Sequence, residues 1–141
     1  MMIELLVATV MVLATVFIHT MGVLLLGRLA RLEQREELNL GISPFSFAGV
    51  TMIMTVVLGL FVLHGLEIWL YAALYLQLGA ISSLREAVYF STQTYAAIGY
   101  SDNAIADAWR LVGAIEGING LLLLGWSTAF FVTVMRRLGR E

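Results

Sequence analysis

Three stretches of this chain are long, apolar and almost free of charge. Residues 5–27 and 38–66 contain no Asp, Glu, Lys or Arg, and residues 111–135 contain only Glu116. Runs of about 20 such residues are long enough to cross a bilayer as helices, which satisfy their own backbone hydrogen bonds in lipid. The composition agrees, because 60% of the residues are hydrophobic and 13% are charged. We therefore predict an all-α integral membrane protein with three transmembrane helices.

The N-terminal apolar run has an alternative interpretation as a cleaved signal peptide. It begins without basic residues and is longer than the apolar core of such a peptide, so we expect residues 1–28 to remain as the first transmembrane helix. The chain has no cysteine, which excludes disulfides and cysteine metal sites. Its net charge of −2 argues against a nucleic-acid partner. We find no nucleotide loop, zinc spacing or catalytic triad, and expect neither an enzyme nor an enzymatic cofactor.

The basic residues, all arginine, indicate the orientation in the membrane. Segments rich in arginine between or beyond membrane spans favour the cytoplasmic side. Arg28, Arg31 and Arg35 follow the first span, Arg136, Arg137 and Arg140 follow the third, and Arg85 and Arg110 lie between the second and third. We therefore place an amphipathic connector at 29–43 and a short tail at 136–141 in the cytoplasm. The N-terminus is then outside the plasma membrane.

A segment between the second and third spans is too short to cross the membrane. Ser83 and Glu86 fit a capping box, and the helix that they begin extends to about Ala96. That is roughly 13 residues, or about 20 Å, so the helix ends within the bilayer. The carbonyl end of a helix favours a cation. Non-helical backbone at this depth is stable only inside protein or against water, so we expect residues 97–101 to line a wet path.

The run from Tyr89 to Asp102, with Ile98-Gly99-Tyr100 at its centre, resembles the pore helix and selectivity filter of tetrameric potassium channels, whose signature is Thr-Val-Gly-Tyr-Gly. The resemblance covers a pore domain at 44–137. It divides into an outer helix at 44–78, a pore helix at 83–96, a filter at 97–102 and an inner helix at 109–135. The first helix has no counterpart in the simplest two-helix members.

This resemblance implies a homotetramer in the lipid bilayer, with K⁺ or Na⁺ in a central pore. The ions would bind to backbone carbonyls of the filter, which comprises Ala97, Ile98, Gly99, Tyr100 and Ser101. Two filter residues depart from the signature. Ala97 replaces the threonine whose hydroxyl forms the innermost oxygen ring, and Ser101 replaces the second glycine, which tolerates left-handed backbone better. We therefore expect a weaker preference for potassium over sodium than in channels with the full signature.

Three carboxylates of the pore domain have predicted roles. Asp102 and Asp107 would concentrate cations at the outer mouth of the pore. Glu116 lies within the third span, where an acidic residue indicates function. We expect it to be protonated and to brace the filter from behind, through Gln93 or Thr92, rather than to face the ions.

Glycines and histidines complete the set of candidate residues. Gly113, Gly117, Gly120 and Gly125 are typical of close helix packing, and a gating hinge at Gly120 or Gly125 remains open. His64 and Glu67 share one face of the second helix, and we expect an interfacial pair with access to water rather than a proton sensor. We interpret His19 as a packing residue of the first helix, and expect that helix to pack outside the pore domain against the second.

Two alternatives to a cation channel remain. One is a non-conducting membrane subunit or assembly factor that retains a degenerate pore loop. The other is a single-repeat relative of potassium transporters with similar filters, although those proteins use four linked or paired repeats and this chain has one.

Overall fold

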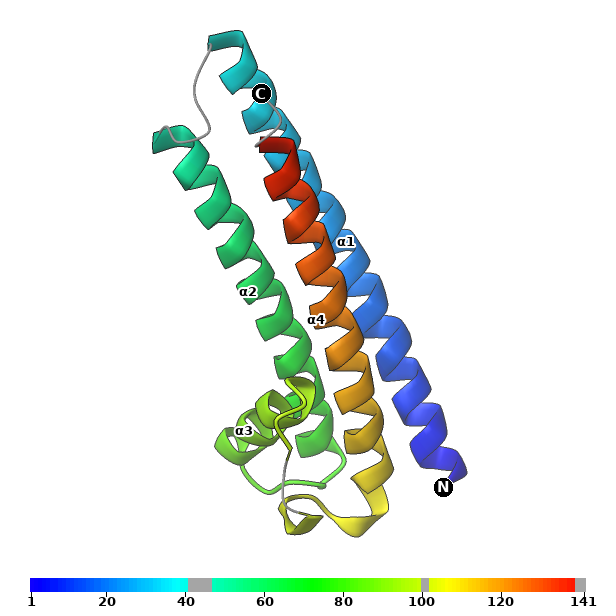
Figure 1. The fold of residues 1–141 in the computed structure, drawn as a ribbon. Coiled ribbons are helices and arrows are strands. Elements are labelled where there is room, and N and C mark those ends of the chain that lie inside the picture. Colours follow the sequence, from blue (N-terminus) through cyan, green and yellow to red (C-terminus); the bar gives the residue numbers. More distant parts are fainter. Residues whose placement is uncertain (41–46, 100–101, 139–141) are drawn as a thin grey trace.

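The computed structural model describes residues 1–40, 47–99 and 102–138, and these residues are mostly helical, with no strand among them (Figure 1). The long helices are α1 (Met2–Leu40), α2 (Phe47–Gln77) and α4 (Arg110–Leu138), and the short helix is α3 (Leu84–Tyr95). Two 3-10 turns, η1 (Asp102–Ala104) and η2 (Asp107–Trp109), lead from α3 towards α4. Within the described residues, three helices are long and apolar enough to cross a membrane. The predicted all-α membrane fold is confirmed.

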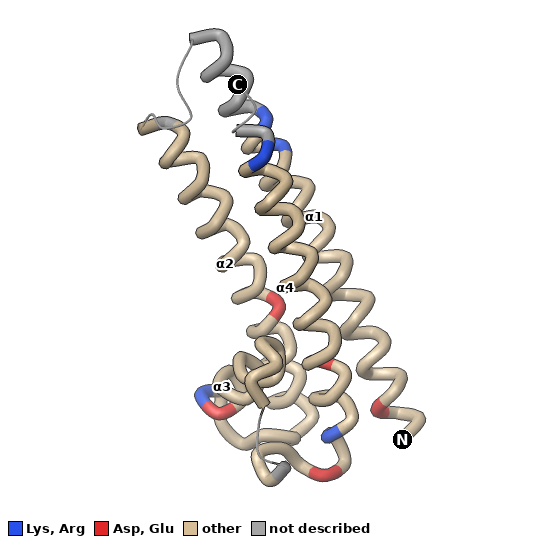
Figure 2. The backbone as a smooth tube through the Cα atoms, in the orientation of Figure 1, with Lys and Arg blue, Asp and Glu red and all other residues tan. Residues whose placement is uncertain are grey.

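The three long helices lie side by side, and α3 lies near the end of the bundle where the N-terminus is found (Figure 1). α1 continues without a break to Leu40, so the first part of the predicted connector extends this helix. The predicted helix start at Ser43-Pro44 lies outside the described residues. Figure 2 shows most charged residues at the two ends of the bundle, whereas Glu67 and Glu116 are buried inside it. This distribution suits a bundle whose middle lies in lipid.

The turn between α2 and α3 aims the short helix back into the bundle. Gly79 adopts a positive φ of 62°, and the amide of Ala80 donates to the Tyr75 carbonyl at 2.9 Å, which ends α2. Ser83 then caps α3, because its side chain accepts from the Glu86 amide at 3.2 Å. The serine half of the predicted capping box is confirmed. The Glu86 carboxylate contacts the Ser82 hydroxyl at 3.4 Å instead of closing the box.

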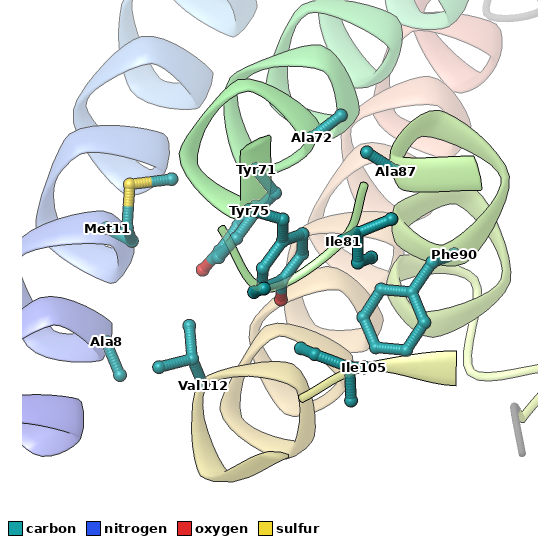
Figure 3. Packing of buried hydrophobic residues seen from close by; sticks show 11 residues of the cluster. Ala8, Met11, Tyr71, Ala72, Tyr75, Ile81, Ala87, Phe90, Ile105 and Val112 are labelled. Atoms are coloured by element: carbon teal, nitrogen blue, oxygen red, sulfur yellow. The ribbon is translucent and has the colours of Figure 1, made fainter. Parts of the chain in front are cut away.

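The apolar core has one cluster around α3 and another near the opposite end of the bundle. In the first, Tyr71 and Tyr75 of α2 pack between α1, α3 and α4 (Figure 3). The Tyr75 ring meets Phe90 of α3 edge to face, with centroids 5.3 Å apart. The other labelled members are Ala8, Met11, Ala72, Ile81, Ala87, Ile105 and Val112. The second cluster consists of Val23, Leu26, Ala30, Met52, Val56, Leu60, Leu63 and Val134.

α1 packs against α2, as predicted, and also against α4, which the prediction did not include. A polar contact supports the pairing with α4, since the amide of Asn119 donates to Thr15 on α1 at 2.8 Å. Hydrogen bonds of this kind help to hold helices together in a membrane. The first helix is therefore an integral part of the bundle.

Candidate pore site and its support

α3 ends about a third of the way along α2 and α4, measured from the end of the bundle where it enters. The backbone of its last residue, Tyr95, lies against Gly120, which is ten residues from the start of α4. The Tyr95 hydroxyl donates to Glu67, which is ten residues from the end of α2. Ten helical residues rise about 15 Å, roughly half the thickness of the hydrocarbon core. For a hydrocarbon core that begins at these helix ends, the residues that follow α3 start near its middle.

The chain leaves α3 through a left-handed turn at Ala97, whose φ is 54°. The amide of Ile98 donates to the Gln93 carbonyl and that of Ala97 to the Thr94 carbonyl, both at 2.9 Å. This is the Schellman arrangement, in which glycine usually holds the left-handed position. Two of the carbonyls at the end of the helix thus bind amides of the next residues. A cation at this end of the helix, as predicted, would therefore have to bind to other carbonyls.

The predicted filter residues are an exposed, non-helical strip in the isolated chain. Ala97, Ile98 and Gly99 are exposed, and Ile98 is exposed to 72%. Gly99 has a φ of 101°, which suits glycine. Tyr100 and Ser101 lie outside the described residues, and η1 begins at the next position. Such a strip at mid-membrane depth must be covered by protein or face water.

The conformation of Ala97 gives a prediction for stability. We expect Ala97→Gly to raise the free energy of unfolding by about 1 kcal/mol, because a left-handed non-glycine residue is strained by about 1–2 kcal/mol. The adjacent Ala96 has a φ of −79°, so Ala96→Gly is the matched control. It should lower the free energy of unfolding by about 0.5–1 kcal/mol. Unfolding of both variants in detergent measures the difference. An Ala97→Gly variant that is no more stable than Ala96→Gly would contradict the left-handed turn.

Glu116, a residue of α4, connects this helix to α2 and to α3. Its carboxylate accepts from the Tyr75 hydroxyl of α2 and the Ser91 hydroxyl of α3, both at 2.5 Å, and it is fully buried. The Ser91 hydroxyl also lies 3.0 Å from the Ile68 carbonyl, an alternative acceptor on α2. The carboxylate is thus placed to hold α3 against α2 and α4.

The predicted partners of Glu116 are wrong. The Gln93 amide donates to the Tyr89 hydroxyl at 3.0 Å, and the exposed Thr92 hydroxyl donates to the Val88 carbonyl. The reason is helical phase. The buried face of α3 recurs every three or four residues and carries Ala87, Ser91, Thr94 and Tyr95, so Thr92 and Gln93 point elsewhere. In the sequence, this spacing indicates that Ser91 lies on the buried face of α3. On the same face, the buried Thr94 hydroxyl has no hydrogen-bond partner within the described residues.

His64 and Glu67 do not form the predicted interfacial pair. Glu67 is fully buried, and its carboxylate meets His19 of α1 as well as His64. Tyr95 of α3 and Ser127 of α4 complete this cluster through hydrogen bonds. The sequence shows that His64 and Glu67 share a face, but it does not show that α1 and α4 cover that face.

The glycines of α4 differ in their surroundings. A Cβ built on Gly120 would lie 2.8 Å from the backbone Cα and carbonyl carbon of Tyr95, and one on Gly117 would lie 3.3 Å from the Thr94 carbonyl oxygen. Gly113 is buried, and a Cβ on Gly125 would meet nothing within 4 Å. α4 is continuous over all four positions. Close packing against the end of α3 therefore accounts for Gly117 and Gly120, whereas a hinge at Gly125 stays a prediction.

At the end of the bundle next to α3, the predicted carboxylates lie in the two turns before α4. Asp107 is 87% exposed and forms an ion pair with Arg110 at 2.8 Å, which offsets part of its charge. Asp102 begins η1. Their effect on cations at a pore mouth stays a prediction.

A family model described as an ion channel matches residues 50–137. The match includes nearly all of α2, the whole of α3, the filter strip and α4, whereas α1 lies outside it. The chain therefore belongs to this family of pore-loop cation channels, whose pore module has two transmembrane helices. No curated protein and no solved structure is similar enough to this chain to count as a match.

Proposed function

We propose that four copies of this chain surround one pore that conducts potassium, with other monovalent cations passing less readily. The observation that carries the proposal is the exposed strip at Ala97, Ile98 and Gly99, which begins near mid-membrane depth at the end of a helix too short to span. Backbone of this kind needs cover or water, and four strips around an axis supply both. Backbone carbonyls can then replace the hydration shell of an ion.

The oligomer follows from the same strip. One chain contributes one wall of a filter, and a closed ring of identical subunits is the common way to complete such a site. Apolar side chains remain exposed on α4, including Ile118, Leu122 and Trp126. In a tetramer these side chains are available for contact with neighbouring copies or for lining the pore below the filter.

The residues behind the strip fix its position. Glu116 binds Ser91 on α3, and Gly120 allows the carbonyl end of α3 to lie directly against α4. Both contacts hold the helix that carries the filter, so we assign them to support rather than to ion binding. Asp102 and Asp107 would attract cations to the outer mouth.

Reconstitution in liposomes separates this proposal from its alternatives. We expect uptake of potassium or rubidium down a gradient, without a coupled ion, and loss of uptake in a Gly99→Val variant, because a branched side chain disfavours the positive φ at this position. A non-conducting subunit would give no flux under any gradient. A single-repeat transporter would require a coupling ion.

Ion preference is tested at the two positions that depart from the signature. We expect Ser101→Gly combined with Ala97→Thr to raise the preference for potassium over sodium by at least about tenfold, equivalent to about 1.4 kcal/mol. Ala97→Thr places a β-branched residue at a φ of 54° in the single and the double variant alike, so both should assemble less well than the wild type, and the preference is compared between assembled channels. Reversal potentials under bi-ionic conditions measure the preference. A wild-type pore as selective as the double variant would contradict the argument from missing ligands.

A further inference from the structure

A buried polar cluster joins all four helices at one point. It consists of His19 from α1, His64 and Glu67 from α2, Tyr95 from α3 and Ser127 from α4. The side chains of His19 and Glu67 are fully buried, and that of His64 is 13% exposed. The cluster is separate from the filter strip and from Glu116. A buried group of two imidazoles and a carboxylate is costly in lipid unless each member has a partner.

The carboxylate of Glu67 is the centre of the cluster. The Nδ1 atom of His19 lies 3.0 Å from its Oε1, and the Nδ1 atom of His64 lies 3.4 Å from its Oε2. One ligand atom from each of the three residues lies within 4.8 Å of those from the other two. Neighbouring ligands around tetrahedral zinc are about 3.3 Å apart, given bonds of about 2.0–2.1 Å. A small inward shift therefore makes the three atoms a zinc-sized set.

The far sides of both imidazole rings meet the same hydroxyl. Ser127 Oγ lies 2.9 Å from Nε2 of His64 and 3.4 Å from Nε2 of His19. A hydroxyl oxygen has two lone pairs, so it can accept from both Nε2–H groups. Both rings then direct a bare Nδ1 towards Glu67, and that of His64 also lies 3.0 Å from the Tyr95 hydroxyl. Ligating histidines in metal sites are oriented in this way, by a partner for the ring nitrogen that does not bind the metal.

A cation can take the place of a proton in this cluster. When both Nε2 atoms carry their protons towards Ser127, the two Nδ1 atoms present lone pairs on the side of the Glu67 carboxylate. A metal ion between the three residues then serves as the positive partner that a ring proton would otherwise supply.

We propose that His19, His64 and Glu67 bind one transition-metal ion of the zinc class in each chain. Two histidines and one glutamate are a known zinc ligand set, and imidazole also suits cobalt, nickel and copper. Ser127 orients the two rings, and the Tyr95 hydroxyl bonds to the carboxylate. The metal tethers α1 to α2 beside Tyr95, the last residue before the turn into the filter. The site stands independently of the proposed potassium conduction.

A groove gives access to this site. It has a volume of about 450 Å³ and is lined by His64, Tyr95 and Ser127 together with apolar residues of α2 and α4. His64 is thus the ligand that an entering ion meets first.

The test is metal binding to the full-length chain, purified with a tag free of histidine and stripped with a chelator. Cobalt(II) is the probe, because tetrahedral cobalt absorbs visible light, and zinc is the competitor. We expect one cobalt ion per chain, displaced by zinc. The chain has two histidines and no cysteine, so imidazole ligation can come only from this cluster. Absence of saturable binding at about 100 µM of either metal would overturn the proposal.

Variants assign the ligands. We expect Ser127→Ala to weaken binding by about 10–100-fold, and His19→Gln and His64→Gln to weaken it by more. Glu4→Gln, a carboxylate paired with the N-terminus away from the cluster, should leave affinity unchanged. Should a ligand variant fail to fold, X-ray absorption of the zinc-loaded wild type decides, with imidazole scattering expected. Wild-type affinity in either histidine variant, or a spectrum without imidazole, would overturn the assignment.

Discussion

Replacing Gly120 with alanine is expected to displace the end of α3 and to abolish ion flux through the proposed pore. A Cβ at this position would lie 2.8 Å from the Cα and carbonyl carbon of Tyr95, and closer still to its oxygen. Backbone atoms cannot move aside by a change of rotamer, so either α3 or α4 must shift. Overpacking usually lowers the free energy of unfolding by about 1–3 kcal/mol, and we expect a value near the upper end of this range. Ion flux in liposomes and unfolding in detergent measure the two effects.

Gly125→Ala is the matched control on the same helix. Its Cβ would meet nothing within 4 Å in the single chain, so this substitution should be neutral or should stabilise α4 by up to about 1 kcal/mol. Equal loss of flux in both variants, with unchanged stability, would indicate that α4 bends at Gly125 during opening. Normal flux in Gly120→Ala would contradict the close approach of α3 and α4.

Removal of the Glu116 carboxylate is the second change with a large expected effect. In Glu116→Ala, the hydroxyls of Tyr75 and Ser91 lose their buried acceptor and a cavity remains. We expect a loss of about 3–5 kcal/mol, the range for breaking a buried polar network. Glu116→Gln keeps the volume of the side chain and one acceptor oxygen, so the free energy of unfolding should fall by only about 1–2 kcal/mol. Unfolding of the two variants in the same detergent gives the comparison.

A double-mutant cycle with Ser91→Ala isolates the contact between α3 and α4. The Ser91 hydroxyl donates to Glu116 at 2.5 Å, so the two substitutions should be coupled by about 0.5–3 kcal/mol. Tyr89→Phe and Glu116→Gln should be additive, because the Tyr89 hydroxyl bonds to Gln93 rather than to Glu116. Additive effects of Ser91→Ala and Glu116→Gln would show that Glu116 does not hold α3.

The spans and the short helix were predictable because they depend on local sequence. Long runs without charge indicate membrane helices, and the capping serine at 83 marks the start of α3. The partners of Glu116 depend on which face of α3 is buried. The spacing of small and polar residues along α3 indicates that face, and the prediction of Gln93 or Thr92 assigned it wrongly. For an amphipathic helix of this length, the buried face is open to prediction.

The cluster around Glu67 was not predictable from the sequence. Transmembrane helices are apolar on all sides, so hydrophobicity does not indicate which face packs inward. His19 is 48 residues from Glu67 in the chain, and Ser127 is 108 residues from His19. Only the packing of α1 against both α2 and α4 brings them together. The left-handed turn at Ala97 was missed for a different reason, since glycine, not alanine, is the usual marker of that conformation.

A density map of the protein in lipid nanodiscs with potassium tests the central claim most directly. We expect four subunits around one axis, with the carbonyls of Ala97, Ile98 and Gly99 directed towards it and ion density between them. The four α3 helices should end beside that axis, each held by Glu116 and Gly120 of its own chain. A monomer or dimer in lipid, or a tetramer whose strips at 97–99 face lipid or contact no shared axis, would contradict it.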